Sequence, residues 1–141
     1  MRIVGPILAA ALLAMTAQAS AQTGETPPTL DGAKTITAPE AKAAIDAGAL
    51  TLDVRRKASF VEGRLPKAKS VGAAKNPQTN EFDLAIYGPN KDKTILVYGH
   101  GSDGWSAVAA VNTAVKAGYS KVLWFRGGYV EWTKAGLPLE Q

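Results

Sequence analysis

The sequence predicts an α/β domain in which a parallel sheet carries helices on both faces. Short apolar runs at residues 50–54, 95–98 and 121–125 are typical of strands. Segments with helical signals separate these runs, and glycines such as Gly48 and Gly118 end the helical segments. Strands that alternate with helices favour βαβ units, which build a parallel sheet. The 141 residues suffice for one domain with a hydrophobic core, and we find no internal repeat.

The remaining elements are expected to be short. Thr37 and Glu40 have the spacing of a capping box, with Pro39 in the first turn, which predicts a helix to about residue 47. The turn-rich region 72–93 predicts little beyond a short helix near 82–86. The other expected elements are a strand at 34–37, a short strand within 64–71, and helices at 58–62, about 106–116 and 129–134.

Residues 1–21 have the pattern of a secretory signal peptide. Arg2 gives a positive start, residues 3–15 are largely apolar, and small-x-small patterns end at Ala19 and at Ala21. The apolar stretch is nearer a dozen residues than the roughly 20 of a membrane span, and no cysteine offers a lipid-anchor site. We therefore expect export, a periplasmic location in a Gram-negative source, and no membrane insertion after cleavage.

The rest of the chain divides into a lead-in and a domain. Residues 22–33 are rich in Pro, Thr and Gly and predict a flexible lead-in, and residues 34–141 form the domain. Without Arg2 the chain has 15 basic and 12 acidic residues, a net charge of +3 that is ordinary for a solvated surface. No basic run interleaved with aromatics predicts nucleic-acid binding. The absence of cysteine and the single histidine exclude disulfides, thiol chemistry and Cys- or His-pair metal sites, and we expect no cofactor.

The polar loop after the strand at 95–98 is the candidate site. A strand, a glycine-rich loop and a helix N-terminus together direct backbone N–H groups toward a bound anion. The loop has no cysteine, lysine or arginine. It runs Gly99, His100, Gly101, Ser102, Asp103, Gly104 and Trp105, and Ser106 opens the following helix.

Three polar side chains of this loop have competing interpretations. His100 is a candidate general base or phosphate acceptor, but a half-exposed loop residue is the favoured interpretation. Ser102 is a candidate nucleophile only with a base beside it, and adjacency to His100 is not triad geometry. Asp103 is expected to cap the helix, and its charge would repel an anion from the loop.

Several motifs, taken in their order and spacing, resemble the rhodanese-like domain family. The likeness covers about residues 35–139. It implies a three-layer α/β/α fold with a five-stranded, mostly parallel sheet and an active-site loop after the central strand. The motifs are Leu52-Asp53-Val54-Arg55, Phe60-x-x-Gly63-Arg64-Leu65-Pro66-x-Ala68, Ile95-Leu96-Val97-Tyr98, Ala117-Gly118-Tyr119-x-x-Val122, Gly127-Gly128-x-x-x-Trp132 and Ala135-Gly136-Leu137-Pro138.

The chain departs from the family pattern at the position that matters most for chemistry. Active members carry sulfur as a persulfide on a cysteine directly after the central strand, and the aligned residue here is Gly99. Glycine supplies no thiolate, and no other cysteine exists. Arg64-Leu65 stands where the family's Gly-His-Ile-Pro segment has its histidine. The loop is one residue longer than in common sulfurtransferases, and Trp105 replaces a frequent basic residue.

The longer loop is similar to that of exported relatives with a Cys-(five residues)-Trp pattern and to that of cell-cycle phosphatases. A phosphatase activity is not expected, because the loop lacks both the thiol and the arginine that this chemistry needs. Asp53 and Arg55 resemble the family's Asp-Val-Arg pair, for which a structural charge-assisted bond is favoured over catalysis. By analogy with the family layout, Arg64 and Arg126 are candidate anion contacts, with surface solvation as the alternative.

The sequence therefore predicts an exported rhodanese-like protein that is inactive in persulfide sulfur transfer and acts as a binding module. Its loop would recognise thiosulfate, sulfite, sulfate, phosphate or an exported protein partner through backbone N–H groups. The alternative is an enzyme with residual or partner-dependent sulfurtransferase activity through residues 99–105, or one that uses His100 or Ser102. No metal and no nucleic acid is expected.

Overall fold

A five-stranded sheet forms the centre of the molecule. The structure, a computed structural model, describes residues 22–141, so the predicted signal peptide lies outside the described residues. The strand order is β1-β5-β4-β2-β3, and every pairing is parallel, as the sequence predicts. The strands are β1 (Ala33–Thr35), β2 (Leu50–Asp53), β3 (Lys69–Ser70), β4 (Ile95–Tyr98) and β5 (Val122–Phe125).

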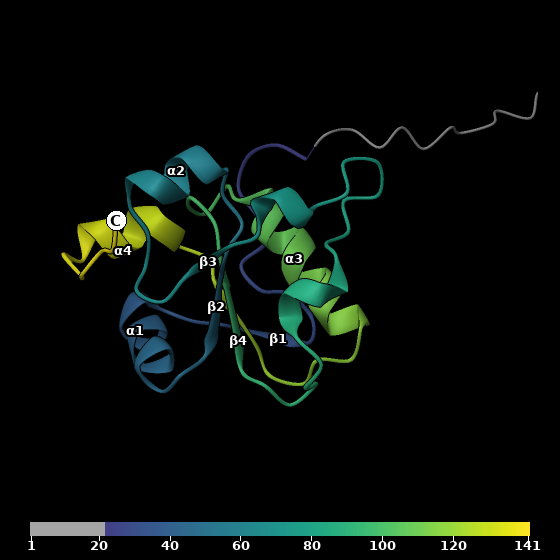
Figure 1. The fold of residues 1–141 in the computed structure, drawn as a ribbon. Helices are drawn as coiled ribbons and strands as arrows, with labels where there is room; N and C mark the ends of the chain where they lie inside the picture. Colours follow the sequence, from purple (N-terminus) through teal and green to yellow (C-terminus); the bar gives the residue numbers. More distant parts are fainter. Residues whose placement is uncertain (1–21) are drawn as a thin grey trace, which may run out of the picture.

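Helices cover both faces of the sheet, which confirms the three-layer α/β/α arrangement. Helices α1 and α4 pack together on one face, and α3 covers the other with the 3₁₀ turn η2 (Figure 1). None of the described helices is long and apolar enough to cross a membrane. The helical elements are α1 (Ala38–Asp46), α2 (Lys57–Glu62), η1 (Gly72–Ala74), η2 (Leu84–Tyr87), α3 (Trp105–Lys116) and α4 (Gly128–Lys134).

The central strand β4 joins the two halves of the core. Its four residues are all buried, because helices lie on both sides of it. Successive strand residues point to opposite faces, so Val97 faces the α3 side and Leu96 the α1 side. On the α1 side the core includes Trp132, which is fully buried. The N-terminal end of α1 has the predicted capping box between Thr37 and Glu40.

The region 72–93 packs more tightly than its turn-rich sequence predicts. The helix expected near 82–86 is the 3₁₀ turn η2, and the Asp83 side chain accepts a hydrogen bond from Ala85 N at 2.9 Å. Tyr87 is buried, and its hydroxyl donates to the carbonyl of Ala110 in α3 at 2.6 Å. Phe82 is buried against the same helix. Tertiary contacts with α3 therefore fix a segment that has no periodic signal of its own.

A buried polar network ties β2 and β4 together at the ends where the candidate loop begins. The Asp53 carboxylate, fully buried, lies 2.7 Å from the Arg55 guanidinium, which also donates to the carbonyl of Gly63 at 2.7 Å. The Tyr98 hydroxyl donates to Asp53 at 2.6 Å and accepts from Leu65 N at 3.2 Å. Burial raises the pKa of the Tyr98 hydroxyl, and the neighbouring Asp53 raises it further, so this group remains a donor.

We expect Tyr98→Phe to destabilise the fold by about 1–3 kcal/mol, because it leaves the buried Asp53 carboxylate and Leu65 N–H each without one partner. The free energy of unfolding from urea denaturation measures this loss. Tyr129→Phe is the matched control. It removes a hydroxyl but keeps the aromatic ring that packs against the Arg55 guanidinium. Its effect should stay within about 0.5 kcal/mol. Equal stability of the two variants would contradict the role given to Tyr98.

Candidate binding site at the loop after β4

The loop from Gly99 to Gly104 connects β4 to α3 and rests on the start of α4. Gly99 is buried, and its carbonyl accepts a hydrogen bond from Tyr129 N at 3.0 Å. The carbonyl of His100 accepts from Val130 N at 2.9 Å. Gly128 has a φ of 56°, and a β-carbon there would collide with the Gly99 carbonyl. The glycine at 128 is therefore what allows α4 to approach the loop.

Helix α3 begins without a side-chain cap, so the prediction that Asp103 caps it is wrong. The N-cap residue is Gly104, and Trp105 N donates to the main-chain oxygen of Asp103 at 3.0 Å. A turn bond from Gly104 N to the carbonyl of Gly101, at 2.9 Å, sets this geometry. The carboxylate of Asp103 is consequently left at the exposed rim of the loop.

Gly99 occupies a niche that has room for a side chain. A β-carbon at this position would lie 3.5 Å from Ala107 Cβ and 3.5 Å from Val54 Cγ2, which are ordinary van der Waals distances. Gly99 is not among the glycines with positive φ. The backbone therefore does not require glycine here, in contrast to Gly128.

A cleft of about 560 Å³ opens beside Gly99 at the carboxyl ends of β2 and β4. Arg55 and Arg56 line it from the β2–α2 connection, but the guanidinium of Arg55 is already bound to Asp53. Arg56 is exposed. The described residues that line the cleft are Gln22, Val54, Arg55, Arg56, Ser59, Gly99, His100, Asp103, Gly104, Trp105, Ser106 and Ala107.

Arg64 and Arg126, the predicted anion contacts, are not among these lining residues. The guanidinium of Arg64 lies 4.5 Å from the ring centroid of Phe60 and donates to the carbonyl of Phe60 at 3.4 Å. Sequence reasoning overlooked Arg56. Its position directly beyond the carboxyl end of β2 could have indicated it, because ligands of open parallel sheets bind at that edge.

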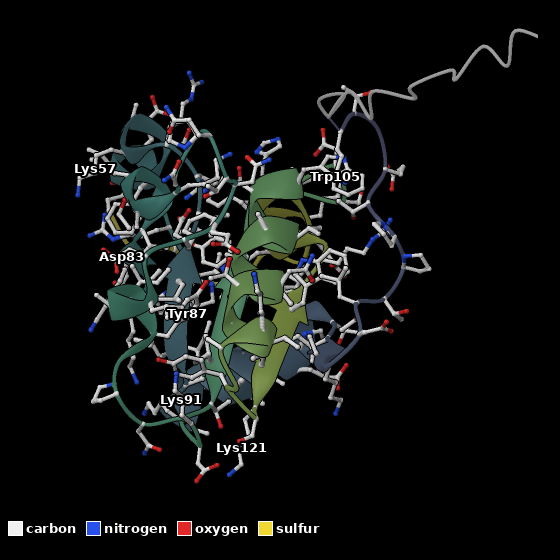
Figure 2. All side chains as sticks on the ribbon, turned by 90° about the vertical axis from the view of Figure 1, so that its right-hand side faces the viewer. Lys57, Asp83, Tyr87, Lys91, Trp105 and Lys121 are labelled. Carbon is white, nitrogen blue, oxygen red and sulfur yellow. The ribbon has the colours of Figure 1, made fainter. Side chains whose placement is uncertain are left out.

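The segment 22–26, here called the N-terminal strap, crosses the outside of the loop. Thr26 is buried, and its backbone N–H and hydroxyl donate to the carbonyl of Ser102 at 2.9 and 2.6 Å. The indole N–H of Trp105 donates to the carbonyl of Gly24 at 3.0 Å. Figure 2 shows Trp105 next to this first described part of the chain. The composition of residues 22–33, which predicts a flexible lead-in, gave no sign of these contacts.

Arg126 fastens the strap instead of facing the cleft. Its guanidinium donates to Glu25 at 3.0 Å and to the main-chain and side-chain oxygens of Thr26 at 2.7 and 3.1 Å. The Glu25 carboxylate also accepts a hydrogen bond from the Ser102 hydroxyl at 2.9 Å. The strap therefore joins the loop to the end of β5.

The remaining loop candidates do not form a catalytic arrangement among the described residues. The hydroxyl of Ser102 is bound to Glu25, and no described hydrogen bond links it to His100. The imidazole of His100 is exposed. Within residues 22–141, no three His, Asp or Glu side chains lie close enough to hold a metal ion.

Comparison with known proteins agrees with this geometry. The sequence profile of the rhodanese-like domain matches residues 37–135. The chain belongs to the rhodanese-like domain family. It is a cysteine-less member of this sulfurtransferase-related superfamily, because Gly99 follows β4 and the sequence contains no cysteine.

Solved structures of other rhodanese-like proteins have a similar fold. The rhodanese-like domain of the Alr3790 protein from Anabaena sp. is 27% identical, with a TM-score of 0.58 over 79% of this chain and 80% of that one. A thiosulfate sulfurtransferase from Pseudomonas aeruginosa is 26% identical, with a TM-score of 0.57 over 77% of this chain and 20% of that one. The RPA3614 protein from Rhodopseudomonas palustris, described as a possible tyrosine phosphatase, shares the fold at 23% identity, with a TM-score of 0.59 over 82% of this chain and 99% of that one.

We expect Arg126→Ala to release the strap, because it removes the donor to Glu25 and Thr26. Hydrogen exchange at the Thr26 amide should accelerate at least about tenfold, and the free energy of unfolding should fall by about 1 kcal/mol. Arg64→Ala is the control, since Arg64 contacts Phe60 and not the strap. Unchanged protection of Thr26 in Arg126→Ala would contradict the fastening role.

The niche at Gly99 predicts that Gly99→Cys folds with a stability change within about 1 kcal/mol, because its β-carbon meets only ordinary contacts. The loop N–H groups and the start of α3 should favour the thiolate and lower the thiol pKa below about 8.5. The pH dependence of alkylation measures that pKa. Ala73→Cys, at an exposed position outside the cleft, serves as the control. Identical pKa values in the two variants would show that the loop has lost the environment of a reactive thiol.

Proposed function

We propose that this rhodanese-like protein is exported, does not transfer sulfur, and binds a small oxyanion in the cleft beside Gly99. The observation that carries the proposal is the intact niche without a nucleophile. The loop, the helix N-terminus and the buried Asp53–Arg55 pair are all present, and the residue that follows β4 is glycine. A persulfide needs a thiolate, which no residue of this sequence supplies.

Free backbone donors support an anion as the ligand. A backbone N–H without an acceptor is costly unless water or a ligand supplies one. Donors next to a helix N-terminus are well placed for a negative oxygen. Within residues 22–141, the N–H groups in and beside the loop that have no protein partner belong to Gly99, His100, Gly101, Ser102, Asp103 and Ser106.

The charges around the cleft limit what it can bind. Arg56 is exposed and forms no ion pair among the described residues, whereas the Arg55 charge is compensated by Asp53. Among the described residues that line the cleft, one is acidic, and it is Asp103. A small anion that uses mainly backbone donors suits this balance better than a highly charged one. Thiosulfate, sulfite, sulfate and phosphate are the probes of suitable size.

The arrangement favours a binding module over an enzyme that uses the loop side chains. Ser102 donates its hydroxyl proton to Glu25 in the strap. His100 has no described partner that would orient its imidazole for proton transfer. A protein partner at the loop would have to compete with the N-terminal strap, which already covers Ser102.

NMR titration of the isotope-labelled mature protein with the four anions tests the proposal. We expect saturable amide shifts confined to residues 99–106 and Arg56, with chloride at matched ionic strength producing none. Arg56→Gln should weaken binding by about two- to fivefold, because it removes an exposed charge. Lys57→Gln is the matched control, since Lys57 is also exposed but does not line the cleft.

Two results would overturn the proposal. Absence of shifts in the loop with all four anions would exclude the oxyanion site and point to a protein partner. Transfer of sulfur from thiosulfate to cyanide by the pure protein would exclude the loss of sulfurtransferase activity.

A further inference from the structure

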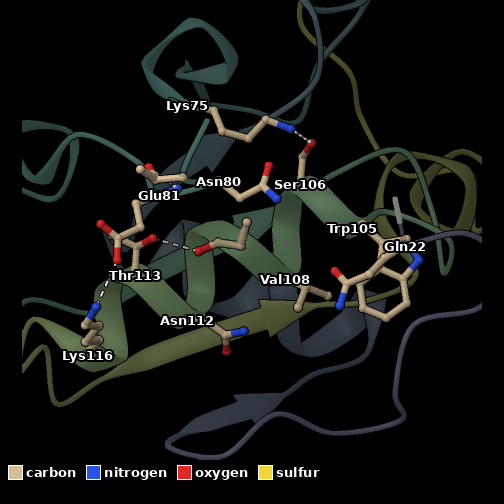
Figure 3. A pocket seen from close by; sticks show the side chains of 12 residues that line it. Gln22, Lys75, Asn80, Glu81, Trp105, Ser106, Val108, Asn112, Thr113 and Lys116 are labelled. Carbon is tan, nitrogen blue, oxygen red and sulfur yellow. Dashed lines mark hydrogen bonds and ion pairs between the residues drawn. The ribbon is translucent and has the colours of Figure 1, made fainter. Parts of the chain in front are cut away.

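The N-terminal strap places residue 22 at the mouth of the same cleft. Gln22 lines the cleft beside Gly99 and also a neighbouring groove of about 430 Å³ along α3. Figure 3 shows Gln22 next to Trp105 at one end of this groove. The hydrogen bond from Trp105 to the carbonyl of Gly24 lies only two residues farther along the chain. Two extended residues span at most about 7 Å, so residue 22 stays within that distance of Gly24.

The cleft has many donors but little uncompensated positive charge. Its charged or titratable side chains are Arg55, Arg56, His100 and Asp103. The Arg55 guanidinium is bound to Asp53, so Arg56 and Asp103 nearly cancel each other at the rim. A further cation at the mouth would favour an anion.

Three other cations lie around the strap and the groove, and only one of them is not paired with a carboxylate among the described residues. In the groove along α3, Lys116 pairs with Glu81 at 2.9 Å, and Lys75 donates to the Ser106 hydroxyl at 3.1 Å (Figure 3). In the strap, Glu25 pairs with Arg126 at 3.0 Å. Lys116 and Arg126 are compensated by these carboxylates, whereas Lys75 keeps its charge beside Ser106 at the edge of the cleft. A cation at residue 22 would add a second positive charge on the strap side.

We propose that the processed N-terminus is itself part of the anion site. Cleavage after Ala21 would make Gln22 the first residue, with its α-ammonium group at the cleft mouth. This group would contribute the cation that residues 99–106 lack. The inference rests on the proposed oxyanion function and on signal cleavage. It makes anion affinity depend on cleavage, because the uncleaved precursor has a neutral peptide bond in place of the positive charge.

The proposal implies a definite dependence on pH. An α-amino group has a pKa of about 7.7–8.0 and is positive below it. Anion affinity should therefore be highest below that range and should fall as pH rises through it. His100 also lines the cleft, and His100→Gln should retain this fall.

Three forms of the same protein test the inference. The first begins at Gln22, and the second begins at Ser20, the product of cleavage after Ala19. The third begins at Gln22 but is cyclised to pyroglutamate: the α-amine attacks the side-chain amide carbon, ammonia leaves, and the positive charge is lost. Intact mass identifies each form, and NMR titration with sulfate and thiosulfate gives its affinity.

We expect the second and third forms to bind about two- to fivefold more weakly than the first, the range of an exposed charge pair. The fall in affinity between pH 7 and 9 should disappear in the cyclised form. Equal affinities in all three forms would overturn the inference and leave the oxyanion site standing. Absence of binding in every form would overturn both. A mature N-terminus at Ser20 in exported protein would also overturn the role of Gln22.

Discussion

The buried carboxylate of Asp53 sets the conditions for the whole candidate site. A fully buried charge is costly unless it is paired and hydrogen-bonded, and Asp53 receives donors from Arg55 and Tyr98. Arg55 in turn reaches the carbonyl of Gly63, and the Tyr98 hydroxyl reaches Leu65 N. These bonds fix the carboxyl ends of β2 and β4 against the segment after α2. The loop can present its backbone N–H groups because it starts from this rigid edge.

Two glycines at the loop have different structural roles. Gly128 is required by the backbone, since α4 would otherwise collide with the carbonyl of Gly99. Gly99 is not required in this way, because ordinary space surrounds its α-carbon. The niche at Gly99 therefore holds no thiol, although it has room for a side chain. The proposed binding function would use the loop directly, because backbone donors remain in place when a side chain is absent.

The N-terminal strap adds a feature that lies outside the family match, which begins at residue 37. Thr26 bridges the loop carbonyl of Ser102 and the guanidinium of Arg126, so it joins two segments that leave the sheet at its carboxyl edge. This contact explains why Arg126 is not available to a ligand. It also sets the position of Gln22. Residues 22–26 thus lie against the candidate site, and Gln22 lines its cleft.

The sequence by itself determined the α/β class, the parallel sheet, the capping box at Thr37 and the rhodanese-like character with Gly99 at the position of the thiol. Each of these depends on local periodicity, on cap chemistry or on residue identity, which are properties of short segments. Only the tertiary structure decided which arginines reach the cleft. It also decided that Asp103 does not cap α3, that residues 82–87 pack on α3, and that residues 22–26 lie on the loop. These features arise from contacts between segments as far apart as Thr26 and Arg126, and no local pattern records which side chains a folded chain brings together.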